Sequence, residues 1–400
     1  MSARIATANT YDASIDSMMT RQRELAESQL QLTSGKRTNR ASDDPAAAAR
    51  VERALAREQR GAASLRAVEA SRTHMTMTES TLGSVTELLQ QAREALVAAG
   101  NPSYGDAERA RIGDSISTIR SQLLSLANQA DGAGRSLFGG QGSSQPPFID
   151  APGGVQFRGI AGQLAAGSEP GLMLSMDGQG IWLSGPTGNG VFETRATTSN
   201  GSAWVDAGNV TNPASLTGST YSVQFTVGAG TTTYSVLKDG APTAALNVAF
   251  NPGTAIEFDG MAMTIQGSPA NGDVFEAVPS SRTLSAFDVL DQAAAALKTP
   301  LRTATQIKQG VADDLRDVDA VFGQFQAARA AAGDALNRLD GSAARWHDAK
   351  LQAATERSEA EDLDMVQAIS EFQRRQTGYD AALKSYSMVQ RLSLFQYLNV

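Results

Sequence analysis

The feature that most constrains the fold of this 400-residue chain is a pair of similar apolar stripes, one near each end. In both stripes the positions advance mainly in alternating steps of four and three, which places them along one side of an α-helix. The stripe near the start consists of Tyr11, Ile15, Met18, Gln22, Leu25, Gln29 and Leu32. The stripe near the end consists of Met365, Ile369, Phe372, Gln376, Tyr379, Leu383, Tyr386, Val389, Leu392 and Phe395. Each end is therefore expected to form a helix that needs a helical partner.

Neither end should be stable as an isolated helix. Burying a large apolar side chain contributes about 1.5–3 kcal/mol, so roughly five of them give on the order of 10 kcal/mol. Ordering the backbone costs about 1–2 kcal/mol per residue, which amounts to several tens of kcal/mol over such a stretch, and hydrogen bonds offset only part of this. We therefore expect residues 1–44 and 365–400 to be assembly segments that are disordered in the monomer and become ordered on docking.

Composition excludes several classes of function. The net charge of −8 and the isoelectric point near 5.0, without a cluster of Lys and Arg, argue against a nucleic-acid partner. Cysteine is absent, so disulfides and thiolate metal sites are impossible. No stretch approaches the length of a membrane span, and the charged first thirty residues lack the apolar segment of a cleaved secretory signal.

The sequence offers little material for catalysis. Its only histidines, His74 and His347, are expected at the surface or at the edge of a helical seam. The segment Ser34–Lys36 lacks the flanking residues of a phosphate-binding loop. The acidic residues between Glu356 and Asp364 are interpreted as a solvated face near a helix start. A hydrolase built only on carboxylates stays open as the last alternative, but no pair of carboxylates indicates one. The predicted protein has no enzymatic activity, no cofactor and no metal ion.

Proline and glycine divide the chain into three parts. Ten of the 13 prolines lie between Pro146 and Pro279, a range that is also rich in glycine. Residues 141–283 are therefore expected to form a β-rich outer domain. The expected strands include a hairpin from Tyr221 to Leu237, a second hairpin that turns at Asp259-Gly260, and a further strand, 274–278.

The flanks, 45–140 and 284–364, are expected to be the two halves of a helical core. The caps predicted for three of its helices are Asp44 followed by Pro45, then Asp106, and then Ser285. One long helix should carry a seven-residue repeat of Val68, Met75, Leu82, Leu89 and Leu96. Another should carry Val311, Leu315, Val318, Phe322, Phe325, Ala332, Leu336 and Leu339. The predicted fold class is mainly α with a β insertion, in which both chain ends build an antiparallel bundle of long helices.

Several motifs carry a resemblance to a known family. The segment LQLTSGKRTNRASDDPAA, residues 30–47, closely resembles the N-terminal signature of the flagellin superfamily. Within that superfamily, DPAAAARV at 44–51, LFGG at 137–140 and LSLFQYL at 392–398 resemble the family of junction proteins between flagellar hook and filament. The segment IQGSPANGDVF, residues 265–275, resembles a β segment of hook-associated proteins. The fold class that this resemblance implies is the flagellin-like one.

The resemblance also implies a function and a set of partners. It implies a structural axial protein of the bacterial flagellum that leaves the cell unfolded through the flagellar type III export channel, without signal cleavage. Its implied partners are further copies of itself, the first hook-associated protein, flagellin, the filament cap protein during assembly, and an export chaperone on the C-terminal region. The implied location is the extracellular flagellum, with neither nucleic acid nor membrane as a partner.

The predicted assembly interface follows from the two terminal stripes. Its residues are Tyr11, Ile15, Met18, Leu25, Leu32, Met365, Ile369, Phe372, Tyr379, Leu383, Tyr386, Val389 and Leu392. Two alternatives stay open at this point. One is the flagellin subunit of the filament itself. The other is a secreted β-domain adhesin in which Trp182 and Trp204 would stack on sugars.

Overall fold

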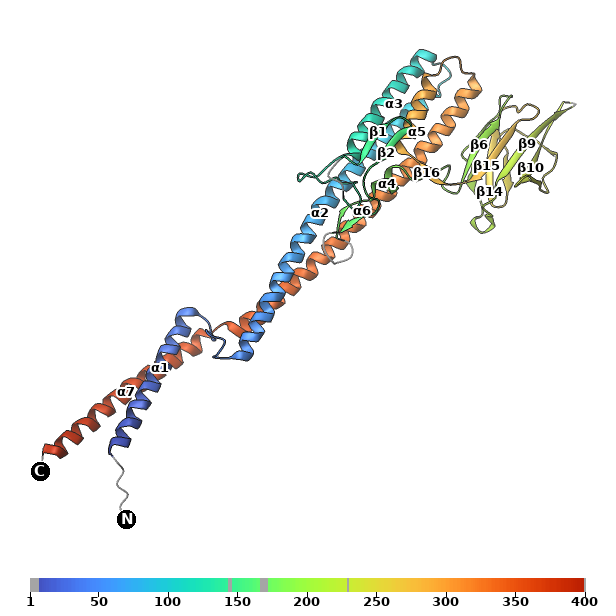
Figure 1. Ribbon diagram of the computed structural model, residues 1–400. Helices are drawn as coiled ribbons and strands as arrows, with labels where there is room; N and C mark the ends of the chain where they lie inside the picture. Colours follow the sequence, from blue (N-terminus) through green and yellow to red (C-terminus); the bar gives the residue numbers. More distant parts are fainter. Residues whose placement is uncertain (1–6, 143–145, 166–171, 229, 399–400) are drawn as a thin grey trace. The chain divides into compact units, whose positions relative to one another are not determined.

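A computed structural model describes residues 7–142, 146–165, 172–228 and 230–398, which form two compact units (Figure 1). One unit comprises Met1–Arg66 with Ser342–Val400, and the other Ala67–Gly341. The helices are α1 (Thr7–Ser34), α2 (Pro45–Ala99), α3 (Asp106–Ala127), α4 (Gly178–Trp182), α5 (Ala286–Lys298), α6 (Ala304–Glu361) and α7 (Met365–Leu398). Because α2 and α6 are long, each contributes residues to both units.

All strands lie between the two helical flanks, as predicted. The first group is β1 (Phe148–Ala151), β2 (Gly154–Phe157), β3 (Leu164–Ala165), β4 (Met173–Ser175) and β5 (Gly185–Pro186). The second group is β6 (Phe192–Thr198), β7 (Trp204–Val205), β8 (Asn209–Val210), β9 (Tyr221–Gly228), β10 (Thr231–Lys238), β11 (Ala241–Pro242), β12 (Val248–Ala249), β13 (Ala255–Phe258), β14 (Met261–Gln266), β15 (Val274–Pro279) and β16 (Arg282–Leu284). The predicted class, mainly helical with a central β-rich insertion, is confirmed.

The helices begin largely where the sequence predicts. Asp44 accepts hydrogen bonds from the N–H groups of Ala46 and Ala47, so α2 starts at Pro45 with the expected cap. Ser285 accepts from the N–H of Asp288 at the start of α5. The predicted cap of α3 is wrong by one residue. Its cap is Gly105, because the carboxylate of Glu108 reaches back to the Gly105 N–H.

The helical part of the unit 67–341 is built on the predicted seven-residue repeat of α2, whose five members from Val68 to Leu96 are all buried. Helix α6 runs antiparallel to α2, since Arg93 pairs with Asp319 while Arg72 pairs with Asp340. Helices α3 and α5 pack together in the same unit. The antiparallel bundle is thereby confirmed within this unit.

The first part of the predicted β domain instead packs on these helices. Trp182, in the short helix α4, is fully buried and stacks on Phe287 of α5 with ring centroids 5.5 Å apart. It also contacts Phe138 and Phe325 edge-on, and Phe148 of β1 joins the same cluster. Phe138, Phe148 and Trp182 therefore complete the helical core, because their large aromatic side chains pack on one another and on Phe287 and Phe325.

The remaining strands form a separate β core within the insertion. One sheet has the order β11-β10-β9-β15-β6 with β12 also on β10, and the other has β13-β14-β7 with β8 also on β14. Both predicted hairpins and the strand at 274–278 are confirmed by their antiparallel pairing. At the second hairpin, Asp259 and Gly260 both have positive φ, as a tight two-residue turn requires. Tyr221, Phe225 and Phe275 lie among the buried residues between the sheets.

Candidate assembly interface

The two ends of the chain pack against each other as the helices α1 and α7 (Figure 1). They run antiparallel, because Arg375 contacts Ser28 whereas Gly378, further along α7, lies beside Arg21, nearer the start of α1. The unit to which they belong thus contains the helical partner that each stripe needs. No third helix covers this pair among the residues that the structure describes in the chain's two ends.

Some of the predicted interface residues lie between the two helices, and others are exposed to solvent. Seven of them are half-buried: Ile15, Met18, Leu25, Leu32, Phe372, Tyr379 and Tyr386. Met365, Ile369 and Leu383 are exposed, by 46%, 45% and 42%. The side chains of Tyr11, Val389 and Leu392 lie outside the described part of the structure. The stripes therefore face each other without forming a closed apolar core.

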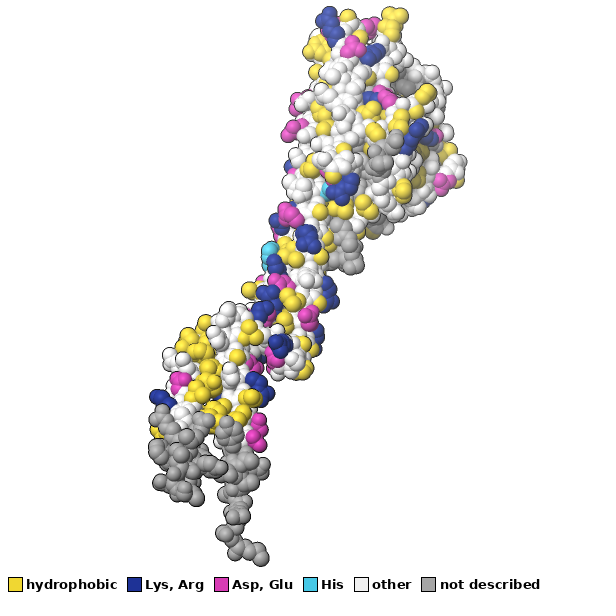
Figure 2. Space-filling model, turned by 60° about the vertical axis from the view of Figure 1, so that its left-hand side comes forward, with side chains coloured by type: hydrophobic (Ala, Val, Ile, Leu, Met, Phe, Trp, Pro, Cys, Tyr) yellow, Lys and Arg dark blue, Asp and Glu magenta, His cyan; other side chains and the backbone are white. Residues whose placement is uncertain are grey.

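A second apolar face was missed by the sequence analysis. Met19 and Leu30 of α1 are 57% and 48% exposed, and Val366 and Met388 of α7 are 81% and 64% exposed. Successive helical residues are 100° apart, so Met19 and Leu30 lie on one side of α1, opposite to Ser28. Figure 2 shows hydrophobic side chains on the surface of these paired ends, in the lower part of the view. These four residues do not share the regular four-and-three spacing of the two stripes, so the spacing alone does not reveal them.

The centre of the α1–α7 pair is polar. Ser28 is 5% exposed and is the one residue of α1 that is buried among the described side chains from Asp12 onward. Its hydroxyl accepts a hydrogen bond from Nη1 of Arg375 at 2.8 Å, and the same nitrogen donates to the carbonyl oxygen of Glu24 at 3.1 Å. A small polar pocket beside this contact is lined by Arg21, Glu24 and the α7 residues Glu371, Arg374 and Arg375.

The loop that precedes α2 and the loop that precedes α7 are connected by hydrogen bonds. The N–H of Arg37 donates to the carbonyl of Glu361 at 2.7 Å, and the N–H of Leu363 donates to the carbonyl of Gly35 at 3.0 Å. Lys36 forms an ion pair with Glu361. Gly35 has φ +69°, a left-handed conformation that glycine adopts without strain. This loop bridge ties the end of α1 to the start of α7.

The acidic run does not lie at a helix start, apart from its last member. Glu356, Glu359 and Glu361 belong to the final turns of α6, where the helix dipole disfavours negative charge. Basic side chains compensate locally, since Arg57 pairs with Glu356 as Lys36 does with Glu361. Asp364 alone caps the following helix, accepting from the N–H groups of residues 366 and 367.

The two histidines differ in their exposure to solvent. His347 is exposed, as predicted, whereas His74 is 1% exposed at the edge of the α2 seam. Its Nε2 lies 2.8 Å from the carboxylate of Asp131, which also accepts from the N–H groups of Ala133 and Arg135. These hydrogen bonds outweigh the opposing effect of burial and hold the pKa of Asp131 well below its ordinary value. The pair closes the turn after α3.

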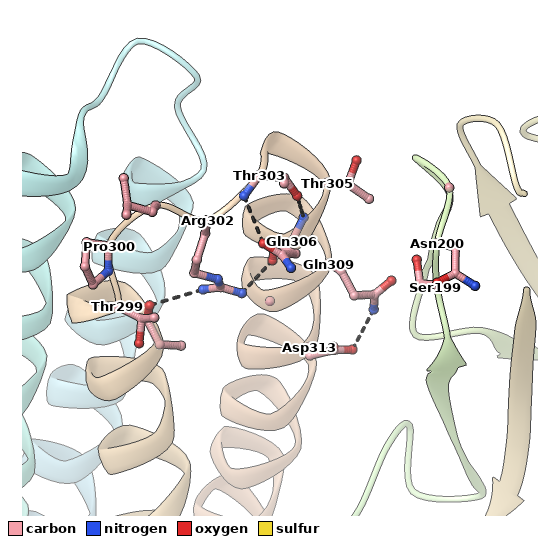
Figure 3. A pocket seen from close by; sticks show the side chains of 14 residues that line it. Ser199, Asn200, Thr299, Pro300, Arg302, Thr303, Thr305, Gln306, Gln309 and Asp313 are labelled. Atoms are coloured by element: carbon pink, nitrogen blue, oxygen red, sulfur yellow. Dashed lines mark hydrogen bonds between the residues drawn. The ribbon is translucent and has the colours of Figure 1, made fainter.

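A pocket of the unit 67–341 lies where the β core meets the turn between α5 and α6 (Figure 3). It encloses about 720 Å³, and its walls include Asn200 on one side and Arg302, Gln306 and Asp313 on the other. Gln309 ties the two sides together by accepting from the N–H of Val205 at 2.9 Å. The walls are mainly polar and carry one arginine and one carboxylate, a mixture that selects no particular ligand.

Arg316 is the second tie between α6 and the β core. It is 9% exposed, donates to the carbonyl of Thr194 at 2.6 Å and pairs with Asp313 and Asp317. Asp314, between these two carboxylates, has a buried Oδ2 atom without a hydrogen-bond partner. Burial, followed by the charges of Asp313 and Asp317, raises the pKa of Asp314 to about 7.

None of the helices, within the ranges that the structure describes, has a segment both long and apolar enough to cross a membrane.

Comparison with known proteins shows which families are similar to this chain. The family described as the bacterial flagellin N-terminal helical region matches residues 5–143. Flagellar hook-associated protein 3 of Salmonella typhimurium strain LT2 is 32% identical over 192 residues, which is 48% of this chain and 57% of that protein. In that alignment the chain spans little more than half of its relative. The protein of the same name from Escherichia coli K12 is 26% identical over 398 residues, which covers 98% of this chain and 99% of that protein.

Solved structures agree with these matches. The crystal structure of FlgL from Xanthomonas campestris in space group C2 has a TM-score of 0.66 and 27% identity, covering 77% of this chain and 99% of that one. The flagellar junction protein FlgL from Legionella pneumophila has a TM-score of 0.62 and 25% identity, covering 68% and 93%. The chain is therefore similar to the flagellar hook-associated proteins 3, and its residues 5–143 match the flagellin N-terminal helical region.

Proposed function

We propose that this chain is a structural axial protein of the bacterial flagellum that forms the junction between the hook and the flagellin filament. The observation that carries the proposal is the paired helices α1 and α7, whose apolar side chains remain half-buried or exposed. Two helices alone have too little surface to cover both apolar faces. Neighbouring copies that present the same helices would cover them through heterologous contacts that wind helically.

Burial of these apolar side chains by neighbouring copies would contribute to the free energy of assembly. Seven large apolar side chains of α1 and α7 are 42–81% exposed, and completing the burial of each contributes roughly 1 kcal/mol. The resulting total of ~7 kcal/mol is close to the free energy of binding at a micromolar dissociation constant. Part of this free energy offsets the entropic cost of ordering the helices. We accordingly propose that residues 1–44 and 365–400 are disordered in the isolated monomer and become ordered on docking.

The proposed partners follow from the junction role. They are further copies in a ring, the first hook-associated protein below, flagellin above, the filament cap protein during assembly, and an export chaperone on the C-terminal region. The chain would leave the cell unfolded through the flagellar type III export channel and remain on the extracellular flagellum, without cleavage of a signal peptide. An unfolded passage suits a chain without cysteine, because no disulfide can trap it. The proposed role is structural and requires no enzymatic activity.

The two alternatives are less well supported. A sugar-binding adhesin would need accessible aromatic rings, but Trp182 is fully buried among Phe138, Phe287 and Phe325. A filament subunit would share the terminal helices, so the two roles differ in abundance and in the effect of loss. Loss of a junction protein should leave hooks intact while flagellin is released into the medium.

The test replaces Leu383 by Asp, in cells that lack the natural protein. Leu383 is 42% exposed on α7, so Leu383→Asp should leave the isolated chain folded but abolish its attachment to hooks, because a carboxylate would have to be buried at the contact. The matched control is Leu246→Asp. Leu246 is 50% exposed in the region of the β core, so this position should tolerate the same change.

The readouts are motility, filament attachment seen by electron microscopy, and flagellin in the medium. Normal filaments on cells that carry Leu383→Asp would contradict the proposal. Equal loss with both variants would show that the effect is not specific to the terminal helices, and would contradict it too.

A further inference from the structure

The contact between Ser28 and Arg375 is a polar contact at the edge of the apolar stripe of α1. Ser28 occupies the side of α1 that also carries Leu25 and Leu32, and it is the buried member of that side. It donates its own hydroxyl proton to the carbonyl of Glu24 at 2.9 Å and accepts from Arg375. The guanidinium of Arg375 thus finds two acceptors, a hydroxyl and a carbonyl, at one position of α1.

Apolar packing alone does not determine how α1 is rotated about its axis. Helix α1 has an apolar stripe toward α7 and a second apolar pair, Met19 and Leu30, on the side opposite to Ser28. Either face could pack on α7 with a similar gain, because apolar burial is not directional. On the second face Arg375 would lack the Ser28 hydroxyl and would approach Arg23, a like charge, which lies about 140° from Ser28.

We propose that Ser28 and Arg375 are positioning residues that fix the rotation and register of α1 against α7, and thereby decide which apolar side chains face neighbouring copies. A single polar contact inside a helical seam has this effect because it is satisfied in one arrangement only, at some expense of stability. The contact directs Met19, Leu30, Val366 and Met388 outward. The inference rests on the proposed function, in which those outward side chains meet other subunits.

The loop bridge joins Gly35 and Leu363 beyond the end of α1, whereas Ser28 lies seven residues earlier, about two helical turns away. The close approach of Arg21 to Gly378 indicates that a particular face of α1 lies on α7, since a Cβ atom at position 378 would lie 3.0 Å from the guanidinium of Arg21. Glycine at this position lets the arginine lie across α7.

The absence of cysteine makes the rotation measurable by cross-linking. One cysteine replaces Gly378, and a second replaces either Arg21, which faces it, or Arg23, which lies at nearly the same height on the other side of α1. A short bismaleimide is applied to the purified full-length chain at low concentration, so that only intramolecular products form. Cross-linking also captures transient pairing, so the ratio of the two yields is informative even where the ends are mostly open.

With Ser28 and Arg375 intact, the Arg21→Cys pair should cross-link at least tenfold more than the Arg23→Cys pair. Combining Ser28→Ala with Arg375→Leu should bring this ratio to within about threefold of one. Ser28→Thr, which keeps the hydroxyl, should restore it. A ratio that remains tenfold in the doubly substituted chain, or that is near one with both residues intact, would overturn the inference.

The assembly assay separates this inference from the proposed function. Arg375→Leu should reduce filament attachment in cells, since outward side chains would be presented in mixed orientations, and Arg375→Lys should restore part of it. If the cross-linking ratio is insensitive to Ser28 and Arg375 while Leu383→Asp still abolishes attachment, the inference fails and the proposed function stands. If Leu383→Asp is tolerated, the proposed function fails whatever the ratio.

Discussion

Asp314 should destabilise the unit 67–341 at neutral and alkaline pH, and Asp314→Asn should relieve this. The carboxylate is largely buried in α6 between Asp313 and Asp317, and its Oδ2 atom has no hydrogen-bond partner. Its two neighbours both accept hydrogen bonds from Arg316, whereas the charges of Arg302 and Arg316 offset only part of the effect of burial on Asp314. An asparagine of nearly the same shape removes the charge without opening a cavity.

The magnitude follows from the shifted pKa. Burial and the two neighbouring carboxylates raise the pKa of Asp314 from 3.8 to about 7 in the folded protein. Each unit corresponds to about 1.4 kcal/mol, so the upper bound is ~4 kcal/mol. Partial exposure of the residue and the buried amide of the variant reduce the expected gain to ~2 kcal/mol.

The direction of the pH dependence is fixed by the sign of the shift. A carboxyl group with a raised pKa in the folded state favours folding below its unfolded pKa of 3.8, and this contribution is lost as pH rises toward about 7. The stability difference between Asp314→Asn and the natural chain should therefore grow from pH 4 to pH 7 and remain constant at pH 8. The variant should be the more stable of the two.

The assay is urea unfolding followed by tryptophan fluorescence at pH 5 and pH 8. Trp182 is fully buried in the same unit, and Trp346→Phe in both proteins removes the tryptophan of the other unit. With a urea dependence near 3 kcal/mol per M, the midpoint should rise by roughly 0.7 M at pH 8. The control is Asp334→Asn, an exposed carboxylate of α6 that should change the midpoint little.

A midpoint that does not change at pH 8, or that falls, would show that Asp314 is adequately solvated or paired. The reasoning would also be wrong if Asp334→Asn produced the same increase, because the effect would then come from the net charge.

Two further predictions concern the turn after α3 and the ends of the chain. Asp131→Asn should lower the unfolding free energy at pH 7 by about 1–3 kcal/mol, because the carboxylate accepts hydrogen bonds from Ala133 and Arg135. Since the pKa of Asp131 is lowered on folding, this stabilisation is present above the unfolded pKa and is lost as pH falls, so the two proteins should converge in urea unfolding below pH 3. Amide hydrogen exchange on the isolated chain should be fast at 7–34 and 365–398 and slow at 68–96, 311–339 and 221–237. Equal protection of all these segments would instead assign the ends to a closed monomer core.

The regular parts of the fold could be predicted because they rest on short-range patterns. The seven-residue repeat from Val68 to Leu96 specifies a long helix, and all its members are buried. Asp44 with Pro45, and Ser285, act through contacts within one helical turn. The hairpin at Asp259-Gly260 is specified by the two residues of its turn.

Contacts between distant segments could not be predicted in this way. The boundary of the β core was placed too early because Trp182 packs with Phe287 and Phe325, which lie more than a hundred residues further along the chain. The polar contact between Ser28 and Arg375 has no periodic signal, since Ser28 lies beside the apolar stripe and is not one of its members. Periodicity found the faces of α1 and α7 that meet, but not the contact that orients them.

The two chain crossings into the β core have a consequence for how such a protein can diversify. Strand β5 pairs with β16, and beyond them Thr187 exchanges hydrogen bonds with Ser280 and Ser281, so the chain enters and leaves at one point. Everything between these residues can be exchanged, enlarged or replaced by a short linker without altering the path of a helix. The β core is therefore a replaceable cassette, and its surface can change while the packing of the helices stays the same.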